Sequence, residues 1–155
     1  MTKHIGVKLI NAFPMTRQAY NDFRGWQLPA DENGADEGYL VEYLDGGKPN
    51  TDRFDGYVSW SPKEVFEKAY RSVSGLSFGL AIEALKQGKK VSRAGWNGKG
   101  LWVQMVPQKG DSVYLSHLEL VYPVPGDGSL PYPNGAFVPW APSQTDVLAE
   151  DWQIV

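Results

Sequence analysis

The residue types best suited to chemistry gather in one short stretch of the sequence, VSRAGWNGKGLW, at positions 91–102. Its glycines do not follow the spacing of the dinucleotide-binding fingerprint, and no lysine there is followed by serine or threonine as in a Walker loop. A catalytic phosphate loop is therefore disfavoured. Two compatible interpretations remain: a tight hairpin turn at Asn97 and Gly98, and a clamp in which Trp96 stacks on a base while Arg93 neutralises phosphate.

The sequence offers few residues for other kinds of catalysis. The sequence has no cysteine and two histidines, which excludes thiol chemistry and leaves no histidine cluster for a metal. His117 lies among leucines, which favours a structural role. The carboxylates of Asp146, Glu150 and Asp151 could act as acid and base, hold a divalent cation, or accept hydrogen bonds from ribose hydroxyls. Asp146 is also placed to complete a helix cap on Ser143, so we favour cap and surface roles and expect no catalytic residue, metal or cofactor.

The composition of the 155 residues is that of a folded protein, with 42% hydrophobic, 13% aromatic and 21% charged residues. The formal net charge of −3 argues against long nucleic acid as a partner. Most basic residues after position 73 nevertheless crowd between Lys86 and Lys99, where they could serve a small anionic ligand. No apolar run is long enough to span a membrane and the start lacks a signal-peptide pattern, so we expect a cytoplasmic protein.

The elements that must position these residues fall into two predicted modules, 1–73 and 74–155, divided in the small, polar segment RSVSG. In the first, the patterns predict a strand within 4–13, a helix over 16–23 capped by Thr16, and an antiparallel hairpin made of YLVEYL and GYVSW. A second helix is predicted to begin with Ser61 as N-cap and Pro62 as its first helical residue.

In the second module, Ser77 is expected to cap a helix whose apolar residues Phe78, Ala81 and Leu85 recur at helical spacing. Extended segments then flank the opening stretch, 112–122 is strand or short helix, and 123–135 is loop. Ser143 starts a short helix that precedes a terminal strand, WQIV. The predicted fold class is therefore α+β, with small antiparallel sheets and short packed helices in two modules.

Two separated motifs in the second module, GKKVSRAGWNGKG and PWAPSQTDVLAEDWQIV, closely resemble those of the phage-encoded anti-Thoeris family, the second type of Thoeris anti-defence protein. The first module is similar to a segment that recurs at the front of phage proteins, recognisable in PMTRQAYNDFRGW. The resemblance implies a sponge rather than an enzyme, which sequesters cyclic ADP-ribose isomers and, in some members, cyclic oligonucleotides of bacterial immune systems such as Thoeris and CBASS. It also implies a homo-oligomer, commonly a tetramer, with pockets formed where protomers meet.

Carried over by position, the resemblance places Trp96 and Asn97 of the GWN motif in a ligand pocket with Trp140 and Asp146 of PWAPSQTD. Phe78 and Arg93 are further candidates, and Trp152 is expected in the core. Our hypothesis is a binding protein that sequesters a cyclic nucleotide signal. Two alternatives stay open, an enzyme that cleaves such a signal through its acidic set and a phage structural or adaptor protein.

Overall fold

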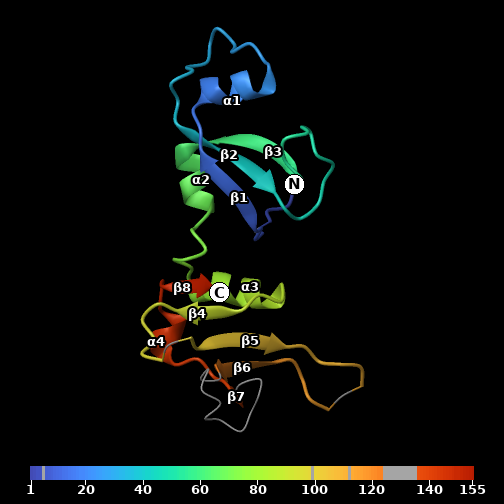
Figure 1. The fold of residues 1–155 in the computed structure, drawn as a ribbon, viewed down its shortest axis with the longest axis vertical. Helices are drawn as coiled ribbons and strands as arrows, with labels where there is room; N and C mark the ends of the chain where they lie inside the picture. Colours follow the sequence, from blue (N-terminus) through green and yellow to red (C-terminus); the bar gives the residue numbers. More distant parts are fainter. Residues whose placement is uncertain (5, 99, 112, 124–135) are drawn as a thin grey trace. The chain divides into compact units, whose positions relative to one another are not determined.

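The computed structural model describes residues 1–4, 6–98, 100–111, 113–123 and 136–155. Figure 1 shows the two compact units into which the chain divides, Met1–Tyr70 and Arg71–Val155. The division falls at the start of the segment RSVSG. Each unit has its own sheet and its own core, which makes the fold α+β with small antiparallel sheets and short helices, as predicted.

The first unit is a three-stranded antiparallel sheet with two short helices. Its strands follow the order β1-β2-β3. The elements along the chain are β1 (Ile10–Pro14), α1 (Arg17–Arg24), β2 (Gly38–Tyr43), β3 (Tyr57–Pro62) and α2 (Lys63–Ala69). The hairpin of β2 and β3 is confirmed, whereas the first strand, predicted within 4–13, begins only at Ile10 and ends one residue past that segment.

The two helices of this unit begin differently from each other. Thr16 caps α1 as predicted, because its hydroxyl accepts a hydrogen bond from the Ala19 N–H at 3.2 Å. The prediction for α2 is wrong by one residue: Pro62 is the N-cap and Ser61 belongs to β3. The cause is the pairing of Pro62 with Gly38, which extends the strand past the local capping signal.

The core of the first unit forms around Tyr20, Leu40 and Val58. Trp60 packs against this cluster and donates its indole N–H to the Met15 carbonyl at 2.8 Å. Its ring lies over Gly38, where an added Cβ would come within 2.4 Å of a ring carbon. Glycine is therefore required at position 38 for the indole to lie against the neighbouring strand.

The second unit carries a five-stranded antiparallel sheet in the order β7-β6-β5-β4-β8. Its elements are α3 (Phe78–Lys86), β4 (Val91–Arg93), β5 (Trp102–Val106), β6 (His117–Tyr122), β7 (Ala136–Pro139), α4 (Gln144–Val147) and β8 (Trp152–Ile154). Of the segment 112–122, left open between strand and helix, residues 117–122 form strand β6, and the terminal strand is confirmed. Most of the predicted loop 123–135 lies outside the described residues.

Helix α3 covers one face of this sheet beside β8 and β4 (Figure 1). Ala81 and Leu85 of the helix are buried with Val91, Val103 and Trp152 of the strands, so the predicted helical face is confirmed. Side chains alternate along a strand, and the face opposite α3 therefore carries the intervening residues of β4, β5 and β8. Among the described residues, no helix is long and apolar enough to cross a membrane.

Candidate ligand-binding site

The connection between β4 and β5 is a loop rather than a two-residue turn. Val91 and Val103 are the residues paired between the two strands. Neither Asn97 nor Gly98 has a positive φ, whereas Gly100 has a φ of 74°. The predicted turn at Asn97 and Gly98 is therefore wrong, because a type I′ turn needs positive φ at both central residues.

Asp151, which precedes β8, accepts hydrogen bonds from the first residues of this loop. Its Oδ2 accepts the Gly95 N–H at 2.8 Å, and its backbone carbonyl accepts the Ala94 N–H at 3.1 Å. A Cβ added at Gly95 would come within 2.9 Å of the same carboxylate oxygen. The loop conformation is thus set by the C-terminal segment rather than by its own turn residues.

A network of hydrogen bonds joins Arg93, Trp96 and Asp146. Arg93 Nη1 donates to Asp146 Oδ1 at 2.9 Å, and Arg93 Nε donates to Asp151 Oδ1 at 2.8 Å. The Trp96 indole N–H also donates to Asp146 Oδ1, at 3.2 Å. The other oxygen of Asp146 accepts the Ser143 N–H at 3.0 Å and the Ser143 hydroxyl at 2.7 Å. Both carboxylate oxygens of Asp146 are therefore occupied, and the predicted capping box is confirmed.

The carboxylates of this network stay charged at neutral pH. Burial raises the pKa of Asp146, but hydrogen bonds from Ser143, Arg93 and Trp96 outweigh it and lower the pKa to about 2. The hydrogen bond from Arg93 lowers the pKa of Asp151 against the effect of burial. A carboxylate with a depressed pKa is a poor general acid or base near neutral pH. Across the described residues, no group of three acidic, histidine or cysteine side chains is arranged to hold a metal.

The aromatic candidates meet in one cluster around Trp152. Trp152 is fully buried, so its predicted place in the core is confirmed. Its ring centroid lies 5.4 Å from that of Trp96, 6.0 Å from that of Trp140 and 5.6 Å from that of Phe78. Trp96 and Trp140 also meet edge to face at 6.0 Å. Three predicted site residues thus support one another, and Asp146 of the ion-pair network holds two tryptophans of the cluster, Trp96 through its carboxylate and Trp152 through its backbone carbonyl.

A cavity of about 330 Å³ lies beside this loop. Its volume is at the lower end of the range for small-molecule sites. It is lined by Ser92, Arg93, Ala94, Trp96, Gly98, Gly100, Leu101, Trp102, Gln153 and Val155. Of the predicted site residues, only Arg93 and Trp96 are in this lining. Asn97 is exposed on the loop between two lining residues, while Asp146, Trp140 and Phe78 contact Trp96 or its neighbours.

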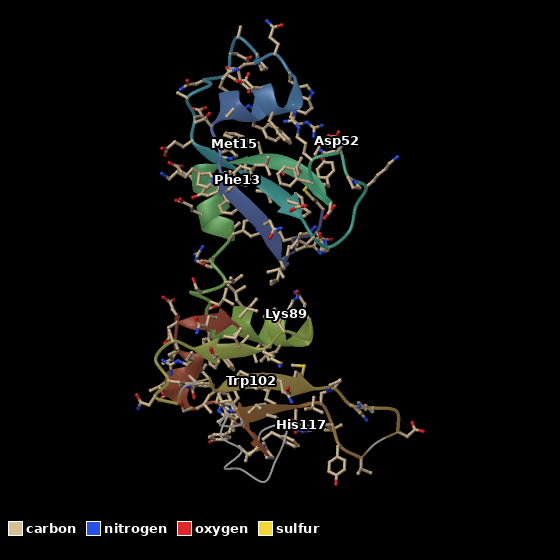
Figure 2. All side chains as sticks on the ribbon, in the orientation of Figure 1. Phe13, Met15, Asp52, Lys89, Trp102 and His117 are labelled. Atoms are coloured by element: carbon tan, nitrogen blue, oxygen red, sulfur yellow. The ribbon has the colours of Figure 1, made fainter. Side chains whose placement is uncertain are left out.

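The cavity contains residues that sequence reasoning did not single out. Ser92 and Gln153 are direct partners across β4 and β8, and Gln153 Nε2 donates to Ser92 Oγ at 3.2 Å. Trp102 of β5, labelled in Figure 2, lies under the Lys90 ammonium, which is 4.6 Å from a ring centroid. Its buried indole N–H has no acceptor among the described residues. The alternation of side chains along strands could have predicted that Ser92 and Trp102 share a sheet face. The position of Gln153 could be predicted only from the register in which β8 pairs with β4.

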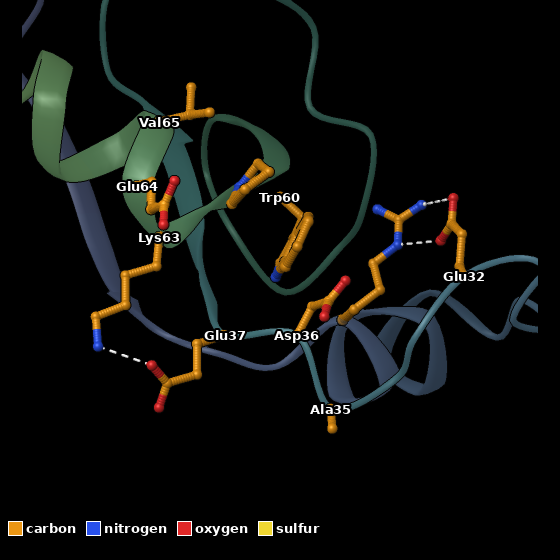
Figure 3. Close-up of a pocket in the computed structure, with 10 residues that line it drawn as sticks. Glu32, Ala35, Asp36, Glu37, Trp60, Lys63, Glu64 and Val65 are labelled. Carbon is orange, nitrogen blue, oxygen red and sulfur yellow. Dashed lines mark hydrogen bonds and ion pairs between the residues drawn. The ribbon is translucent and has the colours of Figure 1, made fainter.

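A larger cavity, of about 780 Å³, lies in the first unit beside Trp60 (Figure 3). Two nitrogens of Arg17, Nε and Nη2, donate to the two carboxylate oxygens of Glu32. Lys63 Nζ lies 2.7 Å from a carboxylate oxygen of Glu37. The remaining charged lining residues, Asp36 and Glu64, are acidic. Both cations are thus neutralised and the lining has an excess of carboxylates, which suits an anionic ligand poorly. The smaller cavity of the second unit is the better candidate.

The fold and the site define the second unit as a small α+β domain with an aromatic-walled cavity braced by a partly buried ion-pair network. Residues 76–155 match the family model of the Thoeris anti-defense 2-like domain, and the chain belongs to this family, as its motifs predicted. A protein named Thoeris anti-defense 2, from Bacillus phage SP01, is 40% identical over 87 residues. That match takes in 94% of the phage protein and 52% of this chain. The first unit lies outside the family model.

Proposed function

We propose that the second unit binds a cyclic nucleotide immune signal and sequesters it without cleaving it. The family supports a phage anti-Thoeris function, and we take the ligands to be cyclic ADP-ribose isomers or cyclic oligonucleotides in the cytoplasm of an infected bacterium. The observation that carries the proposal is the cavity whose lining includes Trp96 and Trp102, because indole rings stack on every kind of base.

The polar surroundings of the cavity suit a nucleotide. Gly98 and Gly100 lie in the lining, and the space that a Cβ would take at these positions is filled by Leu101 and Pro123, so the loop backbone packs closely at the cavity. Lys90, over the face of Trp102, is a cation placed beside the stacking surface. Arg93 is already matched by Asp146 and Asp151, so in our proposal its main role is to hold Trp96 rather than to neutralise phosphate.

The same network favours binding over cleavage. A hydrolytic reaction needs an activated nucleophile or a base whose pKa lies near the working pH. The carboxylates of Asp146 and Asp151, by contrast, have lowered pKa values and bind Arg93. Side chains held in this way position their neighbours and do not take up protons.

We also propose that the protein acts as a homo-oligomer, in our expectation a tetramer. The cavity in one chain is small and open at the surface. Tight sequestration, at nanomolar affinity or about −12 kcal/mol, favours a ligand enclosed on all sides. A second protomer placed over the cavity would supply that enclosure.

The test is isothermal titration of the purified protein with a panel of cyclic ADP-ribose isomers, cyclic dinucleotides and cyclic trinucleotides, followed by denaturation and chromatography of the ligand. Tight binding with intact recovery supports the sponge. Recovery of a linear product would instead identify an enzyme. Absence of binding across the panel would leave the structural or adaptor role. Light scattering of the same sample, with and without ligand, measures the number of protomers.

Asn97→Ala tests the loop itself. Asn97 is exposed and its side chain has no hydrogen bond within the described residues, so we expect the melting temperature to be unchanged. Loss of one ligand hydrogen bond should weaken binding by about 10-fold. Leu115→Ala, at another exposed residue outside the cavity lining, is the control and should bind normally. A fall in stability without a fall in affinity would show that Asn97 is structural.

A further inference from the structure

Gln153 is held in the cavity by its neighbour on the next strand. Its side chain lies on the sheet face opposite α3, since its neighbours Trp152 and Ile154 belong to the core face. Gln153 Nε2 donates to the hydroxyl of Ser92 at 3.2 Å. Ser92 is 7% exposed, so this anchor is fixed by the strands around it. The orientation of the Gln153 carboxamide is thereby defined.

The anchored carboxamide keeps two hydrogen-bonding groups for a ligand. A glutamine side chain has two N–H donors and one carbonyl acceptor. One N–H is used by Ser92, and the second N–H and the carbonyl oxygen have no partner among the described residues. The carboxamide therefore keeps one donor and one acceptor in a cavity that also contains Trp96 and Trp102.

This donor–acceptor pair is complementary to one edge of adenine. Adenine offers the N6 amino group as donor and N7 as acceptor, which a glutamine binds with two hydrogen bonds. Hypoxanthine and guanine offer two acceptors, O6 and N7, on the corresponding edge. With those bases the carboxamide N–H still finds an acceptor, but the carbonyl oxygen faces another acceptor.

The other polar groups of the lining are less able to distinguish bases. Stacking on Trp96 or Trp102 tolerates every base, because each base has a π face. The guanidinium of Arg93 is taken up by Asp146 and Asp151. The Ser92 hydroxyl accepts from Gln153 and is only 7% exposed, and the indole N–H of Trp102 is a buried donor with no acceptor among the described residues. Among the described residues of the lining, Gln153 is the one whose unpaired donor and acceptor both belong to one planar group that is partly exposed.

We propose that Gln153 is the base-selecting residue of the cavity and that it favours adenine over bases with a carbonyl at position 6. The proposal rests on the proposed function, since it assumes that a nucleotide occupies this cavity. In this arrangement Trp96 and Trp102 provide most of the affinity for the base, and Gln153 provides the selectivity between bases.

The experiment compares a cyclic ADP-ribose isomer with its hypoxanthine counterpart, in which a carbonyl replaces the 6-amino group and N1 carries a proton. Isothermal titration gives the ratio of their dissociation constants. We expect wild-type protein to favour the adenine ligand by about 10- to 100-fold, the range for one bidentate base contact. In Gln153→Ala the ratio should approach one, mainly because the adenine ligand binds more weakly.

The ratio separates base selection from a structural role, which would weaken both ligands alike and leave the ratio unchanged. Gln153→Leu keeps the volume of the side chain and replaces Gln153→Ala if that variant does not fold; the same loss of selectivity is expected. Gln104→Ala is the matched control, because Gln104 lies on the same sheet face and donates to Glu119 at 3.1 Å without lining the cavity.

Two results overturn the proposal, and they have different meanings. If wild-type protein binds both ligands tightly without preference, or if a Gln153 variant keeps the wild-type ratio, base selection by Gln153 is wrong while the proposed function stands. If wild-type protein binds neither these ligands nor any other of the panel, the proposed function is wrong. The proposed role of Gln153 is then wrong too, because it requires a bound nucleotide.

Discussion

Replacement of Asp146 by asparagine tests the network that positions Trp96. The pKa of Asp146 is lowered from 3.8 to about 2 by its hydrogen bonds, although burial opposes this. Only 11% of its side chain is exposed, so solvent screens the interaction little. A tenfold change in an acid dissociation constant corresponds to about 1.4 kcal/mol, and the charged form therefore stabilises the folded unit by about 2 kcal/mol. We expect Asp146→Asn to lose at least this much at pH 7.

The sign of the pH dependence follows from the direction of the pKa change. Because the folded pKa lies below the unfolded value, the stabilisation is complete above pH 3.8 and is lost as the pH falls through about 2. The difference between wild type and Asp146→Asn should therefore shrink to about 1 kcal/mol at pH 3. Urea unfolding at pH 7 and pH 3, followed by tryptophan fluorescence, measures both values. Four of the six tryptophans report on the second unit.

Glu83→Gln is the control for this experiment. It breaks the exposed Glu83–Lys86 pair of α3, which has the shorter distance of 2.7 Å but is open to solvent. Exposed pairs contribute less than about 1 kcal/mol, so we expect a small change at both pH values. A loss below about 0.5 kcal/mol in Asp146→Asn at pH 7, or a loss that is the same at pH 3, would refute the reasoning, because a paired charge must lose its effect on protonation.

Three further changes test the two cores and the sheet edge. Gly38→Ala puts a Cβ within 2.4 Å of the Trp60 ring and should cost about 1–3 kcal/mol by calorimetry; an unchanged melting temperature would contradict this. Asn50→Ala removes the side-chain bonds to the Val58 N–H and carbonyl at the edge of β3, so we expect a loss of about 1–3 kcal/mol in urea and more light scattering from association. Leu85→Ala empties a buried site and should cost about 2–5 kcal/mol in urea; less than 1 kcal/mol would mean that α3 refills it.

Local signals in the sequence predict the elements whose ends are decided by neighbouring residues. Thr16 reaches the Ala19 N–H, and Ser143 and Asp146 form a reciprocal cap, because both devices span one helical turn. The spacing of Ala81 and Leu85 likewise gives the buried face of α3. In each case no distant contact opposes the local preference.

Distant contacts decide the parts that sequence reasoning missed. The asparagine–glycine pair of the GWN loop suggests a tight turn, but Asp151 binds the Gly95 N–H from the far end of the chain and shapes a longer loop. Ser61 has the pattern of an N-cap, but strand pairing continues through Pro62. Gln153 enters the cavity only because β8 pairs with β4 in a register that places it opposite Ser92. Such pairings cannot be inferred from one segment alone.

The network also decides which variants can identify ligand contacts. Asp146 binds both Arg93 and Trp96 through one oxygen, so removing its charge weakens two contacts together, one with the indole and one with a guanidinium that Asp151 still binds. A weaker affinity in Asp146→Asn would therefore follow from a displaced Trp96 even if Asp146 never touches the ligand. Asn97 has no such connection, and Gln153 is tied only to Ser92 among the described residues. Variants at those two positions separate direct contact from positioning, because their effect on affinity does not pass through the ion pairs.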